Sequence, residues 1–416
     1  MRISTTMQYT NSLGYIKNSN SKVDEQATKY NSGLKFQSAG EDPSGMASKV
    51  KYEGAIAAYK QYIEAGGIAN NSLSEEETAL SSMWDTLSSV HTRLQQCVNG
   101  SNDRSSLKAL SAEIAQLRDH LFDLMNTQNT EGEYIFTGAQ SDIETYTLTS
   151  TGKYECQADG STRGVVVSPS VNVQVSDSGL DIFENCKTAY TVKVDETPSI
   201  AAFERCEIKS YGTFNKVFED NYDPSATYNP LDPDNSKNKL TIELDGKGNF
   251  KLLGADGAEI ESGVVDTTTS INKISVRGME FTISDANANG KIYIELEKPK
   301  TENMLNILTD IVATIDDESV SNVDKIAAIT KCQVDVEIAL SHYDSYRGQI
   351  GARQNAITNI LNANESLSAI KVESKANVSE VDAFEAASEL IRAQNQLTVS
   401  RQIYSMLNKQ SLFDFI

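Results

Sequence analysis

Residues 9–34 read YTNSLGYIKNSNSKVDEQATKYNSGL, and this stretch decides how the chain is interpreted. Its apolar side chains recur at alternating steps of four and three residues, which is the seam of a coiled coil. Such a seam is stable only when a second helix covers it. The stretch therefore predicts a helix over roughly residues 3–36 whose seam consists of Tyr9, Leu13, Ile16, Asn20, Val23, Ala27, Tyr30 and Leu34.

The other end of the chain repeats the pattern. The same steps connect Ala386, Leu390, Ala393, Leu397, Ser400, Tyr404 and Leu407, and the last six residues carry Leu412, Phe413 and Phe415. An ordinary intramolecular bundle would share this periodicity. We favour an assembly surface, because the first stretch is rich in Ser, Thr and Asn, which form helices weakly. The candidate interface residues are Leu13, Ile16, Asn20, Val23, Tyr30, Leu34, Leu390, Leu397, Tyr404, Leu407, Phe413 and Phe415, with Asn20 and Ser400 expected to fix the register.

Proline separates the helical ends from the middle of the chain. Apart from Pro43, every proline lies between Pro169 and Pro299, so long helices are predicted only outside that window. Asp42 and Pro43 are suited to begin a helix, and Gly66-Gly67 is the expected weak point within it. We predict an α+β fold, a long coiled-coil-like helical rod built from both termini with an inserted, outward-projecting β-rich domain. Its parts are an assembly helix and turn (1–42), two halves of the rod (43–133 and 301–380), the β-rich domain (134–300) and a second assembly helix (381–416).

Strand-like runs and turn dipeptides mark the middle region. Residues 165–167, 171–175 and 240–244 are rich in Val, Ile and Leu, and Asp245-Gly246 and Asn289-Gly290 are typical hairpin turns. Residues 218–238 are predicted to form a long surface loop. Residues 285–292 resemble a calcium loop, but Leu296 stands where a bidentate Glu is needed, so we interpret them as a hairpin.

Composition argues against several classes of function. The 416 residues carry a formal net charge of -21, which disfavours nucleic acid and anionic membranes as partners. The three histidines are not clustered, and no nucleophile, phosphate-binding or zinc motif is present, so we expect no enzyme activity, cofactor or metal. We also expect no cleaved secretory signal and no membrane-spanning segment. Five cysteines without a C-x-x-C pair do not indicate a disulfide framework.

Three motifs resemble the flagellin family. Residues 30–35 (YNSGLK) and 41–47 (EDPSGMA) are similar to the family's turn and D-P-x-G-x-A helix start. Residues 130–138 (TEGEYIFTG) resemble its join between helical and β regions, and residues 347–355 (RGQIGARQN) its carboxyl-terminal R-x-x-x-G-A-x-x-N element. The resemblance covers about residues 1–140 and 300–416.

The two ends are similar to one kind of family member. The start, MRISTTM, and the end, SLFDFI, resemble the subunits that adapt the flagellar hook to the filament. The resemblance implies an extracellular structural subunit in a ring of about eleven copies, exported without a cleaved signal peptide. It also implies contacts with the first hook-associated protein, with flagellin, and with an export chaperone at the carboxyl-terminal region. Flagellin itself, and less so a secreted helical-bundle adhesin, remain alternatives.

Overall fold

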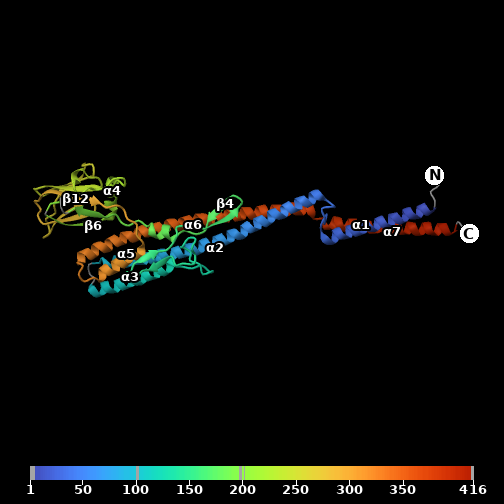
Figure 1. Cartoon of the computed structure of the whole chain (residues 1–416), viewed down its shortest axis with the longest axis horizontal. Coiled ribbons are helices and arrows are strands. Elements are labelled where there is room, and N and C mark those ends of the chain that lie inside the picture. The colour runs from blue at the N-terminus through green and yellow to red at the C-terminus, as the bar shows by residue number, and fades with distance from the viewer. Residues whose placement is uncertain (1–4, 100–102, 196–198, 201, 414–416) are drawn as a thin grey trace. The chain divides into compact units, whose positions relative to one another are not determined.

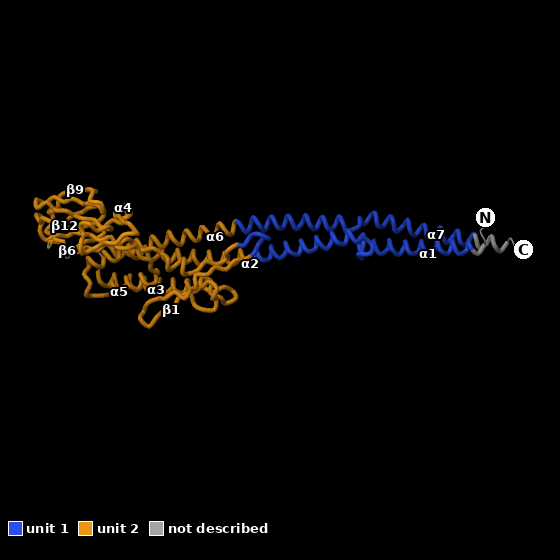
Figure 2. Tube along the Cα trace, turned by 45° about the horizontal axis from the view of Figure 1, so that its top comes forward, with its two compact units in different colours: residues 1–68, 166–172, 356–416 blue, residues 69–165, 173–355 orange. Residues whose placement is uncertain are grey.

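The computed structural model describes residues 5–99, 103–195, 199–200 and 202–413. It divides them into two compact units, coloured separately in Figure 2. Unit 1 contains residues 1–68, 166–172 and 356–416, and unit 2 contains residues 69–165 and 173–355. Helices occupy the two terminal regions and strands the middle of the chain (Figure 1). The predicted α+β class is confirmed.

Unit 1 is built from helices contributed by both ends of the chain. Its amino-terminal part contains α1 (Thr5–Ser32) and the start of α2 (Pro43–Cys97). Its carboxyl-terminal part contains the end of α6 (Asn322–Ser379) and α7 (Ala383–Phe413). Asp42 begins α2 as predicted, because its Oδ1 accepts the backbone N–H of Ser44 at 3.1 Å and of Gly45 at 2.9 Å.

The first helix ends earlier than the sequence pattern predicts. Gly33 has φ +66°, a left-handed conformation that ends a helix and favours glycine. Leu34 was predicted as a helical seam residue, and this was wrong: it forms an isolated antiparallel bridge with Glu380. Two backbone hydrogen bonds form this bridge, from Lys35 N to Ser379 O at 2.8 Å and from Val381 N to Gly33 O at 2.9 Å.

Gly66 lies against α6 in a helix that is not interrupted, and the expected weakness of Gly66-Gly67 stays a prediction. Helix α2 continues through Gly66-Gly67 without interruption. A Cβ at Gly66 would lie 2.5 Å from Cδ2 of Leu361 on α6, which is closer than carbon atoms can approach. A side chain at Gly66 would therefore require the Leu361 side chain to move.

Besides α4, which packs with the strands, the described part of unit 2 contains four longer helical segments. They are the end of α2, α3 (Arg104–Met125), α5 (Met304–Asp316) and the start of α6. The predicted resumption of helix near Thr301 is interrupted at residues 317–321, between α5 and α6. Apolar side chains from these helices are fully buried, including Leu73, Leu80, Met83, Leu87, Ile114, Leu121, Leu308, Val336 and Tyr343.

The strands of unit 2 form two larger sheets. The five-stranded sheet has the order β5 (Val192–Asp195), β12 (Asn289–Leu296), β7 (Lys239–Asp245), β8 (Asn249–Leu253) and β9 (Glu259–Val264). The three-stranded sheet has the order β10 (Asn272–Val276), β11 (Met279–Ile283) and β6 (Phe203–Ile208). Side chains from both sheets and from α4 (Tyr211–Asn221) share one apolar core.

Two short hairpins precede these sheets in the chain. The first pairs β1 (Tyr146–Leu148) with β2 (Tyr154–Cys156), and the second is made by β3 (Gly164–Ser168) and β4 (Val171–Gln174). The predicted runs at 165–167 and 171–175 largely coincide with β3 and β4.

One predicted hairpin turn is confirmed and the other is wrong. Gly246, with φ +72°, lies in the turn between β7 and β8. Asn289-Gly290 instead begins β12, where Asn289 is paired with Asp245 of β7. The pairing with β7 therefore determines the conformation of Asn289-Gly290.

Residues 222–238 form the predicted loop, which contains one short 3-10 turn. Helix α4, which precedes the loop, was not predicted.

Candidate assembly surface

Helices α1 and α7 lie side by side in unit 1 and run antiparallel (Figures 1 and 2). The rings of Tyr9 and Tyr404 meet edge to face with centroids 5.7 Å apart. Ser19 Oγ lies 3.4 Å from Ser400 Oγ, farther along the pair. The contacts pair low residue numbers of α1 with high numbers of α7, which is the order that two antiparallel helices require.

The seam predicted for α7 faces α1. Ala386, Ala393 and Leu397 are buried there, while Leu390 and Tyr404 are half-buried. None of the described α1 side chains is fully buried. Two small alanines and one leucine bury little apolar area, so the pair by itself is weakly stabilised.

Of the two rows of side chains predicted to form the seam of α1, one faces α7 and the other is replaced by a neighbouring row. Ile16 and Val23 are half-buried against α7, as predicted. The second row that turns toward α7 contains the half-buried Ser12, Ser19 and Gln26, each one residue before a predicted seam position. Asn20 is exposed, and Ser19 rather than Asn20 meets Ser400. Within this helix pair Asn20 therefore makes no contact with Ser400, and a role of the two residues in the register between subunits stays a prediction.

The remaining candidate residues lie at the edges of the pair or outside it. Leu13 is 58% exposed and Tyr30 is 49% exposed. Leu34 is half-buried but lies beyond the end of α1. Leu407 and Phe413 belong to α7, with side chains outside the described part of the structure, and Phe415 lies outside the described residues.

Sequence reasoning missed a second apolar row on α7. Phe384 is 88% exposed, Ile391 58% and Val399 52%. Met406 is also more than half exposed, and at 100° per residue these four lie on the side of α7 opposite Ala393 and Leu397. Ile403 is 51% exposed and lies on the flank between the two rows. The seven-residue step from Phe384 to Ile391 was the signal that could have identified this row.

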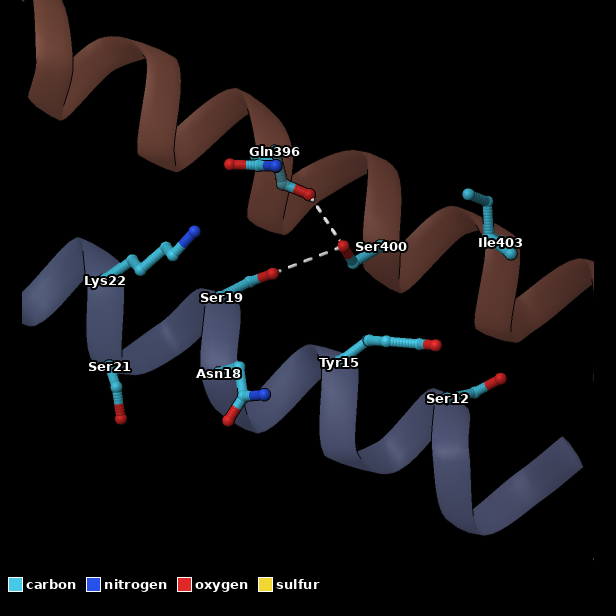
Figure 3. Close-up of a pocket in the computed structure, with 9 residues that line it drawn as sticks. All are labelled: Ser12, Tyr15, Asn18, Ser19, Ser21, Lys22, Gln396, Ser400 and Ile403. Atoms are coloured by element: carbon cyan, nitrogen blue, oxygen red, sulfur yellow. Dashed lines mark hydrogen bonds between the residues drawn. The ribbon is translucent and has the colours of Figure 1, made fainter. Parts of the chain in front are cut away.

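A groove of about 650 Å³ follows the pair on one side (Figure 3). Ser19 and Ser400 reach toward each other across it, and the Ser400 hydroxyl donates to Gln396 O at 2.9 Å. Its lining mixes polar groups with the exposed Tyr15 and Ile403, so it can accept both hydrogen-bonding and apolar side chains. The lining residues are Ser12, Tyr15, Asn18, Ser19, Ser21, Lys22, Gln396, Ser400 and Ile403.

Metal-ligating side chains do not cluster in the described part of the chain. Among the described residues, no group of three or more His, Cys, Asp or Glu is placed to hold a metal ion. His91 contacts Glu337 at 3.0 Å, and His342 contacts the carbonyl oxygen of Asp181 at 3.4 Å. None of the described helices has the length and apolarity needed to cross a membrane.

Comparisons with known proteins find similarity to flagellar proteins. A model of the bacterial flagellin N-terminal helical region matches residues 3–141. The flagellar hook-associated protein 3 of Escherichia coli is 26% identical over 199 residues, which cover 48% of this chain. The chain matches 62% of the length of that relative, which is less than two thirds.

Two further similarities extend along most of the chain. Polar flagellin B/D of Vibrio parahaemolyticus is 23% identical over 393 residues, covering 89% of this chain and 88% of that protein. The solved structure of flagellar hook-associated protein 3 from Legionella pneumophila has a TM-score of 0.58 at 21% identity. It covers 79% of this chain and 98% of its own, which shows a common fold. The chain thus matches the flagellin N-terminal helical region over residues 3–141 and is similar to flagellar proteins along most of its length.

Proposed function

We propose that this chain is a structural subunit of the bacterial flagellum that adapts the hook to the flagellin filament. The observation that carries the proposal is the unmatched surface of the terminal helices. Helix α7 presents one apolar row to α1 and a second row, beginning with Phe384 and Ile391, to solvent. A helix with apolar rows on opposite faces requires more than one partner helix to cover it.

Self-assembly is the simplest way to cover that surface. Repeated head-to-tail contact between identical subunits closes into a ring when the rotation per subunit fits. We propose a ring of about eleven copies, with the inner layer formed by α1 and α7. The hook side would contact the first hook-associated protein and the filament side flagellin, and an export chaperone would bind the carboxyl-terminal region before assembly.

The proposed location is the extracellular flagellum, reached without a cleaved signal peptide. Export in an unfolded state suits a chain whose terminal helices are weakly stabilised alone. Ordering a residue costs about 1–2 kcal/mol, and the α1–α7 pair buries few large side chains. We expect both helices to gain most of their stability on assembly.

Deletion of the gene tests the proposal. The expected phenotype is a cell with hooks but without filaments that releases flagellin into the medium. Restoring the unaltered gene should restore filaments, which excludes effects on neighbouring genes. Normal filaments in the deletion strain would overturn the proposal.

Flagellin is the second candidate, favoured by the end-to-end similarity to polar flagellin B/D. Growth on filament fragments discriminates between the two. A flagellin extends such fragments into long filaments, whereas a junction subunit adds a short cap and stops. Long filaments made of this chain alone would favour flagellin.

A further inference from the structure

Three charged side chains meet inside unit 2, away from the terminal helices. Glu76 comes from α2, Asp177 from the segment after β4, and Arg353 from α6. Glu76 is 2% exposed and Asp177 is 3% exposed. Buried charges are costly unless each is paired, so the pairing within this cluster decides its behaviour.

The guanidinium of Arg353 pairs with the carboxylate of Asp177. Its Nη1 lies 2.7 Å from Oδ2 of Asp177 and its Nη2 lies 3.0 Å from Oδ1, a bidentate ion pair. Gln174 Nε2 also donates to Asp177 Oδ1 at 2.7 Å. The single cation is thereby balanced by a single carboxylate.

Glu76 is left as a second acid beside this neutral pair. Its Oε1 accepts the backbone N–H of Asp177 at 3.0 Å. Its Oε2 is buried and has no hydrogen-bond partner among the described residues. If Glu76 were ionised, the cluster would contain an uncompensated buried negative charge.

The surroundings of Glu76 favour its neutral form. Burial, followed by the negative charge of Asp177, raises the pKa of Glu76 well above its usual range, and Arg353 opposes this only in part. The titratable side chain of Tyr346, on α6, also lies near Asp177 and Arg353, and burial raises the pKa of its phenol. Glu77, the next residue on α2, instead pairs with Arg347 at 3.5 Å.

We propose that Glu76, Asp177 and Arg353 form a proton-controlled latch that holds residues 173–179 against α2 and α6. With a proton on Glu76, the cluster is neutral and the segment stays docked. Loss of that proton places two carboxylates against one guanidinium, and the segment loosens to let water reach Glu76. The device acts within unit 2 and does not depend on where the subunit assembles.

The direction of the pH effect follows from proton linkage. A carboxyl whose folded pKa is raised binds a proton in the docked state at pH values where the released state has lost it. Docking is therefore strongest below the ordinary carboxyl range and weakens as the pH rises from there to the raised pKa. Within that window the docking equilibrium changes by up to about tenfold per pH unit.

Amide hydrogen exchange of residues 173–179 in the full chain tests the latch. Exchange is measured from about pH 5 to about pH 9 and corrected for the intrinsic effect of pH on exchange. Unaltered protein should show a corrected rise approaching tenfold per pH unit within the window, and Glu76→Gln should remove it. The matched control is Glu75→Gln, which neutralises the preceding carboxylate of α2 and should retain the rise. Equal pH dependence in Glu76→Gln and unaltered protein would overturn the proposal.

A second measurement reads the proton directly and does not depend on the folding of Glu76→Gln. Carbon-13 NMR follows the Glu76 carboxyl carbon through a pH titration of the full chain. We expect a midpoint above the ordinary glutamate range, and a lower midpoint in Asp177→Asn, where Arg353 is free to pair with Glu76. An ordinary midpoint in unaltered protein, or no shift in Asp177→Asn, would refute the latch.

Discussion

Replacing two outward-facing residues of α7 gives a direct prediction about assembly. Ile391 and Val399 are 58% and 52% exposed on the side of α7 that faces away from α1. Serine at both positions, Ile391→Ser with Val399→Ser, removes apolar surface that neither α1 nor the rest of unit 1 covers. The double variant should therefore keep the fold of the subunit and lose affinity for its assembly partners.

The magnitude follows from the area that remains to be buried. Full burial of a Val or Ile side chain is worth about 1.5–3 kcal/mol, and slightly more than half of each is still exposed. Together the two positions should contribute about 2–3 kcal/mol to assembly. Positions eight residues apart on a helix are separated by about 12 Å, far enough for their effects to add. The expected loss is roughly 30- to 150-fold in affinity.

Binding to isolated hooks measures this loss. The purified chain is titrated onto hook preparations, and the bound fraction is determined by quantitative immunoblotting. Val323→Ser with Ile271→Ser is a matched control, because both residues are about half exposed but lie outside the terminal helices. This control should bind within about threefold of the unaltered chain, the effect of a change near 0.5 kcal/mol.

One result would refute the reasoning. If the α7 double variant binds hooks as tightly as the unaltered chain, the outward row is not part of the interface. Circular dichroism melting curves exclude the trivial explanation of unfolding. The curves of the double variant and the unaltered chain should coincide, because substitution of exposed side chains changes stability little.

Three further predictions concern the stability and reactivity of the subunit. Gly45→Ala should destabilise the first turn of α2 by about 1–3 kcal/mol, because a Cβ there would lie 2.6 Å from the ring of Phe36, and thermal unfolding measures the loss. Asn303→Ala should cost about 1–3 kcal/mol in urea denaturation, since Asn303 caps α5 and donates to Glu184 at 2.9 Å. Cys186 should react slowly with a thiol reagent at pH 8 until the chain is denatured, because burial and the nearby Asp335 raise its pKa to about 12.

Each of these predictions has a control or a contradicting result. Gly54→Ala in the same helix meets no atom within 4 Å and should stabilise α2 by about 0.5–1 kcal/mol. Equal effects at Gly45 and Gly54 would show that Phe36 does not restrict the turn. A native Cys186 that reacts as fast as denatured protein would contradict its burial. An unchanged urea midpoint for Asn303→Ala would contradict the capping role.

The sequence predicted those features whose causes are local. Asp42 and Pro43 begin α2 because a capping carboxylate and a preset φ act within a few residues. The α7 seam was also predicted, since Ala393 and Leu397 are placed by helical periodicity alone. Such features depend on neighbours in the chain, which a single sequence contains.

Other features depend on distant partners and were missed. Asn289-Gly290 has the composition of a turn, but pairing with β7 makes it the start of a strand. Helix α4 carries Tyr211, Phe214 and Phe218 at helical spacing, yet the proline-rich surroundings favoured strands. On α1, either the row that contains Leu13 or the row that contains Ser12 can face α7. Which of them does so depends on the small residues of α7 that lie opposite, Ser400 among them.

Immunogold labelling of isolated flagella tests the central claim most directly. Antibodies are raised against residues 134–300 and applied to intact hook–filament preparations for electron microscopy. A subunit that adapts hook to filament predicts label in a single band between the two structures. Label along the whole filament would contradict the account in favour of flagellin, and absence of label from flagella would contradict a flagellar role altogether.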